Sequence, residues 1–124
     1  MSFLIILSAM LLPVNIQTLD TPRRIVIFGN KNLPAVKQQW ELLQKDSIGL
    51  TERDIQLTLV APGGKQYQKF SVNPLDPFTV ILVGRDGGEK YRSNEVTSTK
   101  QFFALIDAMP MRKVEMRKQK NRLP

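Results

Sequence analysis

Two uninterrupted apolar runs constrain most strongly what this chain can fold into. Residues 24–28 read RIVIF and are followed by Gly29 and Asn30, and residues 78–84 read FTVILVG. Their apolar residues are consecutive and do not alternate with polar ones, which is typical of buried strands. A third run over residues 55–60 ends before Pro62 and is also expected to be a strand. The chain should therefore fold around a buried sheet.

Helical spacing appears between and after these strands. The apolar residues expected on the first helix are Leu33, Val36, Trp40 and Leu43. Asn32 is predicted to cap this helix, and Gln39 is expected to face water. Ser98 and the glutamine three residues later form a capping box that predicts a second helix, which should stop at Pro110. A hairpin is predicted at residues 86–88, because glycine supplies the positive φ of tight turns, with a polar edge strand over 89–93.

The element order is strand, helix, strand, a linker, a hairpin and a final helix. A parallel strand–helix–strand unit followed by an antiparallel hairpin and a covering helix is the thioredoxin-like arrangement. We therefore predict an α/β fold over residues 19–111, with a central mixed sheet of about four strands and covering helices. Another small α/β or α+β sandwich with a mixed sheet is the alternative.

The residue types that are missing exclude several kinds of chemistry. The chain has no cysteine and no histidine, which excludes thiol redox chemistry, disulfides, the usual zinc sites and histidine-based triads. The carboxylates are scattered, and no phosphate-binding glycine motif is present. We expect no catalytic residue, no metal and no cofactor, and the chain is not expected to be an enzyme.

The N-terminus carries a separate signal. Residues 3–14 read FLIILSAMLLPV and contain no charge. Twelve residues are too few to span a membrane, which takes about 20, but their number fits the apolar core of an export signal. No lysine or arginine precedes the run and no A-x-A site follows it. We favour a signal peptide over residues 1–18, hence a secreted or periplasmic protein without a membrane span after cleavage. An uncleaved anchor or a packed N-terminal element stays open.

The positive charge is concentrated at the C-terminus, over residues 112–124. The basic residues there are Arg112, Lys113, Arg117, Lys118, Lys120 and Arg122. With Glu115 as the one acid among them, they carry +5 of the net charge of +7. We expect a solvated, mobile tail, and contact with a polyanion such as an acidic glycan is the alternative. Because the rest of the chain is nearly balanced, nucleic acid is not favoured as a partner.

Two motifs resemble a known family. The strings GRDGGEK (84–90) and IDAMPMR (106–112) are similar to a domain of unknown function found in exported bacterial proteins. The same domain occurs in vertebrate secreted matrix proteins, namely the sushi-repeat-containing group and the coiled-coil-domain protein down-regulated by oncogenes. The similarity spans about residues 23–117. It implies a thioredoxin-like fold without redox cysteines, a secreted setting and binding or adhesion roles, and it carries over no catalytic residue.

The junction of the first strand and helix is the first candidate site. In thioredoxin-like enzymes the redox pair lies there, whereas this chain has no thiol between Gly29 and Pro34. A helix N-terminus beside Asn30, Lys31 and Asn32 could still bind a small anion, although simple capping by Asn32 is the plainer interpretation. Pro77 is the candidate for the cis-proline of such enzymes, with Pro74 as the second choice. An ordinary trans bond is equally consistent with the sequence.

Asp107 is the second candidate. An acid near a helix C-terminus is unfavourable for the helix dipole, so a cation should compensate for it. Arg112 or Arg85 is the expected partner, either as a structural ion pair or as part of a partner surface.

Together these observations predict a noncatalytic, exported thioredoxin-like module that binds an unknown protein or an acidic glycan. The alternatives are a polyanion-binding protein acting through the basic tail and an enzyme with cysteine-independent chemistry at Asp107, Arg85 or Lys31.

Overall fold

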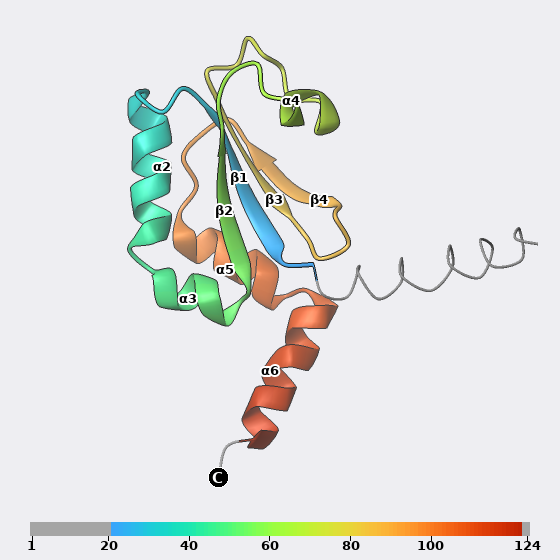
Figure 1. The fold of residues 1–124 in the computed structure, drawn as a ribbon. Helices are drawn as coiled ribbons and strands as arrows, with labels where there is room; N and C mark the ends of the chain where they lie inside the picture. The colour runs from blue at the N-terminus through green and yellow to red at the C-terminus, as the bar shows by residue number, and fades with distance from the viewer. Residues whose placement is uncertain (1–20, 123–124) are drawn as a thin grey trace, which may run out of the picture.

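A computed structural model describes residues 21–122 (Figure 1). The four strands and the two predicted helices follow the predicted order, and three further helices accompany them. The strands are β1 (Arg23–Gly29), β2 (Ile55–Val60), β3 (Phe78–Val83) and β4 (Glu89–Ser93). The helices are α2 (Pro34–Gln44), α3 (Ser47–Glu52), α4 (Gln66–Lys69), α5 (Thr99–Asp107) and α6 (Pro110–Arg122). The predicted signal peptide over residues 1–18 lies outside the described residues. Among the helices within residues 21–122, none is long and apolar enough to cross a membrane.

The four strands form one mixed sheet in the order β2-β1-β3-β4. β1 pairs in parallel with β2 and antiparallel with β3, and β3 pairs antiparallel with β4. The predicted pairing of residues 78–83 with the first strand is therefore confirmed. All six residues of β3 are buried, as expected of a strand whose apolar residues are consecutive.

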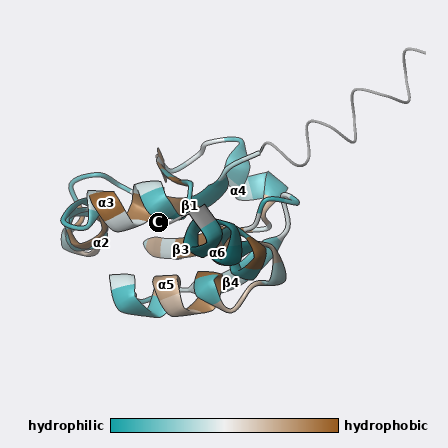
Figure 2. Cartoon of the chain, turned by 90° about the horizontal axis from the view of Figure 1, so that it is seen from below, coloured by the Kyte–Doolittle hydropathy of each residue, from teal (hydrophilic) through white to brown (hydrophobic). Residues whose placement is uncertain are grey.

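Each face of the sheet has its own core, because successive strand residues point to opposite faces. Ile25 and Val80 belong to the face covered by α2, α3 and α5, where Phe102 also packs. Val26 and Ile81 belong to the other face, which is covered by the segment around α4. Figure 2 shows α4 and α5 on opposite sides of β1 and β3. The linker residues Tyr67, Phe70 and Val72 belong to the core on this second face.

The start of α2 differs from the prediction. Leu33, not Asn32, is the N-cap residue, and it makes no side-chain capping hydrogen bond. Pro34 restricts the preceding residue to extended backbone, which is the N-cap conformation, and Leu33 has φ −71° and ψ 132°. Asn32 instead donates its backbone N–H to the Asn30 side chain at 2.9 Å. The loop before α2 is therefore closed by Asn30.

The expectation that Gln39 faces water is wrong. Its side chain is fully buried, and its amide holds both backbone groups of Thr97. Nε2 donates to the Thr97 carbonyl oxygen at 2.9 Å, and Oε1 accepts from the Thr97 N–H at 2.8 Å. A buried amide is tolerated when it is hydrogen-bonded in this way, and this one ties α2 to the loop that precedes α5.

The chain beyond Asp107 is the other correction. α5 ends at Asp107, which confirms that this helix stops before Pro110, but Pro110 also starts a further helix, α6, that was not predicted. Proline is well suited to the first turn of a helix, since its missing N–H has no intrahelical partner there. The segment predicted to be a mobile tail from residue 112 onward is thus helical to Arg122. The expected domain boundary at residue 112 falls in the first turn of α6.

Candidate functional site

The structure separates the candidate residues into two groups at opposite ends of β1. Asn30, Lys31, Asn32 and Pro77 lie where β1 leads into α2, and we call this place the β1–α2 corner. Arg85, Asp107 and Arg112 lie at the other end, where β1 starts and α6 leaves the body (Figure 1). Seven strand residues separate the two ends by about 20 Å. The candidates therefore cannot form a single site.

Gly29 and Pro77 make the closest backbone approach in the corner. Gly29 has a φ of +152°, and a Cβ atom there would lie 2.6 Å from the Pro77 carbonyl oxygen and 2.8 Å from Val36 Cγ2. Only glycine fits such a position without a shift of its neighbours. Pro77 thus faces the corner as predicted, but among residues 21–122 every peptide bond is trans. The pairing of Gly29 with Phe78 already brings Pro77 there, so a cis bond is not needed.

The surface of the corner carries both polar and apolar side chains. Asn30, Lys31 and Asn32 are all exposed. A shallow pocket of about 350 Å³ lies between the loop over residues 29–31, Leu59 and residues 61–62. Leu75, two residues before Pro77, is 87% exposed. This surface offers a cation, amides and apolar side chains, which are groups that suit binding.

A cluster of ion pairs occupies the other end of the sheet. We call it the arginine cluster, and its cations are Arg23, Arg53, Arg85 and Arg112. Glu115 accepts from three of them: Arg23 Nη2 at 3.0 Å, Arg85 Nε at 3.1 Å and Arg112 Nη1 at 3.4 Å. The cluster therefore joins β1, the β3–β4 turn and α6 through one carboxylate.

Asp107 is the second carboxylate of the arginine cluster. Arg53 donates to it through Nε at 3.0 Å and Nη2 at 2.9 Å, and Arg112 donates through Nε at 3.3 Å. The predicted pairing with Arg112 is confirmed, and the alternative pairing with Arg85 is wrong. Arg85 instead binds Asp54 at 2.7 Å and Glu115, because the β3–β4 turn places it beside β1 and not beside the end of α5.

Both carboxylates are held in their charged form. Burial alone would raise the pKa of Asp107, but the hydrogen bonds and charges of Arg53 and Arg112 outweigh it and lower that pKa below its usual value. Burial likewise opposes ionisation of Glu115, and Arg23 and Arg85 lower the pKa of that group in spite of it. Each acid is paired with more than one arginine and stays ionised, which indicates that the two acids hold the elements together and do not exchange protons.

Sequence reasoning missed Arg23, Arg53 and Glu115. Arg23 and Glu115 are 92 residues apart in sequence, so no local pattern links them. One signal was available: Glu115 is the only acid in the basic stretch, and an isolated acid among cations is a candidate for ion pairs. Arg23 is also the first residue of β1, and it is buried there.

The basic residues of α6 divide between the body and solvent. Arg112 is 4% exposed and is bound by Asp107 and Glu115. The prediction that Arg112 contacts a polyanion is therefore wrong. Lys113, Arg117, Lys118 and Lys120 are exposed. Figure 1 shows α6 extending away from the body, and Figure 2, which looks toward the end of this helix, colours it strongly hydrophilic. The side chain of Arg122 lies outside the described part.

Metal ligands do not gather in the part of the chain that the structure covers. Among residues 21–122, no three carboxylates come together as a metal ion would need. The acids of the arginine cluster are each engaged by guanidinium groups.

Comparisons with known proteins agree with this architecture. Residues 64–115 match a family model described as a domain of unknown function (DUF4174). Among curated proteins, no sequence matches the chain.

Solved structures match over most of the chain. One, from work on thioredoxin-2, a component of the malaria parasite protein secretion machinery, is 23% identical, with a TM-score of 0.55 over 71% of this chain and 84% of that one. A malarial protein is 25% identical, with a TM-score of 0.55 over 70% and 96%. Trxlp from Edwardsiella tarda is 20% identical, with a TM-score of 0.53 over 75% and 89%. The chain has a thioredoxin-like fold.

Proposed function

We propose that this thioredoxin-like chain is a noncatalytic binding module that contacts a protein partner through the β1–α2 corner. The observation that carries the proposal is the corner itself. It keeps the close approach of Gly29 to Pro77 but has asparagine, lysine and leucine where a redox enzyme of this fold has its thiols. A thiolate is the nucleophile in such enzymes, and the corner contains no cysteine.

The exposed side chains of the corner support a protein partner. Leu75 is largely exposed, and Lys31 and Leu59 both line the shallow pocket of the corner. Apolar side chains ringed by polar groups are the usual composition of an interaction surface. A small anion at the start of α2 is less well supported, because Leu33 and Pro34 occupy the first positions of that helix.

Export to a secreted or periplasmic location belongs to the same proposal. The charge-free run over residues 3–14 and the resemblance to vertebrate secreted matrix proteins support it. A chain without disulfides needs a core that is stable by itself in such a compartment, and the two cores of the sheet meet that need. N-terminal sequencing of exported material should find a start between residues 15 and 21, and an intact Met1 on a cytosolic protein would contradict export.

Redox assays test the noncatalytic part of the proposal. Purified protein is incubated with insulin and dithiothreitol, and separately with hydrogen peroxide and a thiol donor, with a thioredoxin and a peroxiredoxin as positive controls. We expect no disulfide reduction and no peroxide consumption above buffer. Turnover in either assay, at a rate proportional to protein concentration, would show a cysteine-independent chemistry and overturn the proposal.

A second candidate function is favoured by α6. The single acid of this helix, Glu115, is bound by three arginines of the cluster, so it does not neutralise Lys113, Arg117, Lys118 and Lys120. These four exposed cations stand on a helix that projects from the body (Figure 1). We infer that α6 can bind an acidic glycan, because uncompensated cations on one projecting element attract polyanions.

Heparin affinity measured against salt concentration tests this second function. Exchange of the four exposed α6 cations for glutamine should abolish retention at 150 mM salt. A charge-matched control exchanges Lys37, Lys45, Lys65 and Lys100, which are exposed on the body, and should keep most of the affinity. Equal losses in both variants would indicate a nonspecific effect of net charge and would rule out a site on α6.

A further inference from the structure

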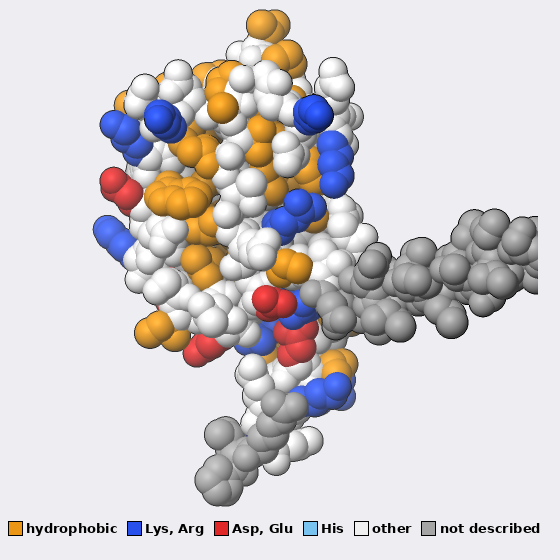
Figure 3. Space-filling model, viewed as in Figure 1, with side chains coloured by type: hydrophobic (Ala, Val, Ile, Leu, Met, Phe, Trp, Pro, Cys, Tyr) orange, Lys and Arg blue, Asp and Glu red, His pale blue; other side chains and the backbone are white. Residues whose placement is uncertain are grey.

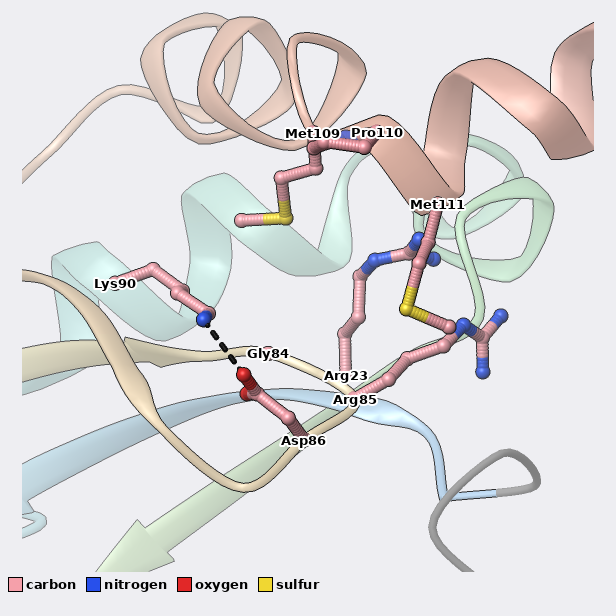
Figure 4. A pocket seen from close by; sticks show the side chains of 8 residues that line it. All are labelled: Arg23, Gly84, Arg85, Asp86, Lys90, Met109, Pro110 and Met111. Carbon is pink, nitrogen blue, oxygen red and sulfur yellow. Dashed lines mark hydrogen bonds and ion pairs between the residues drawn. The ribbon is translucent and has the colours of Figure 1, made fainter.

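A second pocket lies beside the arginine cluster, at the end of the sheet away from the β1–α2 corner. It has a volume of about 340 Å³ and lies between the β3–β4 turn and the junction of α5 and α6. Figure 4 shows Arg23 in the middle of its lining, with Lys90 and Met109 on one side and Arg85 and Met111 on the other. We call it the methionine pocket. Its volume is within the range of small-molecule sites.

The pocket contains a buried donor that lacks an acceptor. The Arg23 side chain is 1% exposed. Its Nη1 donates to the Arg53 carbonyl oxygen at 2.8 Å, and its Nη2 donates to Glu115 at 3.0 Å. Its Nε is buried and has no hydrogen-bond partner among the described residues. Because buried donors are almost always paired, the Arg23 Nε–H calls for an acceptor from outside the chain.

The donor belongs to a guanidinium cation, which favours an anionic acceptor. Arg23, Arg85 and Lys90 line the pocket, against Asp86 alone. Asp86 is bound by Lys90 at 2.9 Å and by the Gly88 N–H at 2.9 Å. Lys90 and Asp86 therefore balance each other. Arg23 and Arg85 are paired with acids outside the lining, Arg23 with Glu115 and Arg85 with Asp54 and Glu115, but the Arg23 Nε–H takes no part in these pairs. Hydrogen bonds from a guanidinium to a carboxylate are stronger than those to a neutral acceptor.

The rest of the lining is apolar. Met109, Pro110 and Met111 face the pocket from the α5–α6 junction (Figure 4). Met111 is 43% exposed and does not serve the core. Unbranched methionine side chains adapt to apolar groups of varied shape. A ligand that fits both features has an apolar tail against the methionines and one carboxylate at Arg23.

We propose that the methionine pocket binds a small monocarboxylic acid, with its carboxylate accepting from Arg23 Nε and its aliphatic or aromatic tail packed on Met109 and Met111. This site is independent of the β1–α2 corner, since the two lie at opposite ends of β1. A negative result for one of the two proposed sites therefore does not contradict the proposal for the other.

Methyl NMR of the full exported chain, labelled with ¹³C at the methionine methyl groups, tests this site. 3-Phenylpropionate is the probe, and 3-phenylpropan-1-ol, which has the same tail without a charge, is its control. We expect the Met109 and Met111 signals to shift saturably with the acid and at least tenfold more weakly with the alcohol. No saturable shift at millimolar acid, or equal affinities for acid and alcohol, would overturn the proposal.

Two variants locate the binding. Met111→Glu places a negative charge at the rim and should weaken binding of the acid at least tenfold. Val114→Glu makes the same change of charge on the same helix at a side chain that is 40% exposed and outside the pocket lining, and should change the affinity less than twofold. Equal effects of the two variants would place the acid elsewhere.

Arg23→Lys keeps the charge but removes Nε–H. In a variant whose thermal unfolding is still cooperative, we expect affinity for the acid to fall toward that for the alcohol. A crystal structure that shows an ordered water on Arg23 Nε in 10 mM 3-phenylpropionate, with the pocket otherwise empty, would contradict the assignment.

Discussion

Gln39 shows how much one buried polar residue can decide. Its amide meets both backbone groups of Thr97, and a hydrophobic residue of similar size would leave these groups buried without partners. We predict that Gln39→Leu lowers the free energy of unfolding by about 2–4 kcal/mol. Gln38→Leu, at an exposed position of the same helix, should change it by less than about 0.5 kcal/mol. Urea denaturation of both variants measures the difference, and similar values would show that the Gln39 hydrogen bonds contribute little.

Gly29 carries the second prediction at this scale. Gly29→Ala combines a positive φ with a clash against Pro77, whereas Gly63→Ala has a positive φ of +88° and open space around its Cβ. Gly63→Ala should therefore cost about 1 kcal/mol of stability, and Gly29→Ala should cost clearly more. Thermal unfolding of the two variants separates backbone strain from the clash. If Gly63→Ala is at least as damaging, the approach of Pro77 is not tight.

Individual side chains were the least predictable part of the molecule. Gln39 and Arg23 are polar residues that their own neighbours in sequence would place in water. Each is buried because its partner comes from far along the chain: Thr97 for Gln39, and Glu115 for Arg23. Asn32 was expected to cap α2 because asparagine is a common N-cap residue. Pro34 restricts Leu33 to extended backbone, and Leu33 is therefore the N-cap residue instead.

At the scale of elements, α6 depends on the arginine cluster. Few apolar contacts hold this basic helix, so Glu115 is its main attachment to β1 and the β3–β4 turn. We predict that Glu115→Gln lowers the free energy of unfolding by about 1–3 kcal/mol and increases amide exchange in α6 before the sheet. Glu41→Gln, on the exposed side of α2, is the matched control and should have little effect. Unchanged exchange in α6 would contradict this role of Glu115.

Acid should weaken the same attachment. The pKa values of Asp107 and Glu115 are lowered in the folded state, relative to about 3.9 and 4.3 in an unfolded chain. Their ion pairs therefore stabilise the fold fully above those unfolded-state values, and the contribution is lost as the pH falls through the folded-state values. The melting temperature should be flat above about pH 5 and should fall below about pH 4.

A double variant, Asp107→Asn with Glu115→Gln, isolates this contribution. Its melting temperature should be lower at pH 7 and should fall less in acid. Some decline remains, because the pKa values of Asp86 and Glu89 are also lowered, through hydrogen bonds from Lys90 and Arg92. A double variant with the full acid dependence of the parent chain would show that other carboxylates are responsible.

Elements that depend on local patterns were predicted well, and α6 was not. Residues 78–83 form a strand in any context that buries both faces, and the Ser98 cap starts α5 as its capping box indicates. The residues of α6 are mostly charged and have no clear apolar face, so nothing local distinguishes a helix from a solvated tail. Its order comes from contacts with acids and arginines that the fold brings together.

At the scale of the whole molecule, the order of the elements was enough to predict the sheet. Two runs of consecutive apolar residues, a helix between parallel strands and a glycine hairpin are compatible with few sheet topologies. The thioredoxin-like topology is the one observed. The site was harder, because the two candidate places lie at opposite ends of β1, and the ion pairs at one of them include Arg23, Arg53 and Glu115, which no local pattern indicated. In the face shown by Figure 3, apolar side chains gather over the upper part of the body, and the acids near the lower end lie beside basic side chains.

Site-specific photocrosslinking in the native environment of the chain tests most directly whether the β1–α2 corner is the binding surface. A photoreactive amino acid replaces Lys31 or Leu75 in the corner, or Lys45 at the far end of α2 as the control. The account predicts one discrete adduct from positions 31 and 75 and none from 45, and excess unmodified protein should compete for it where excess Lys31→Glu/Leu75→Asp variant does not. No adduct at the corner, or the same adduct from position 45, would contradict the account.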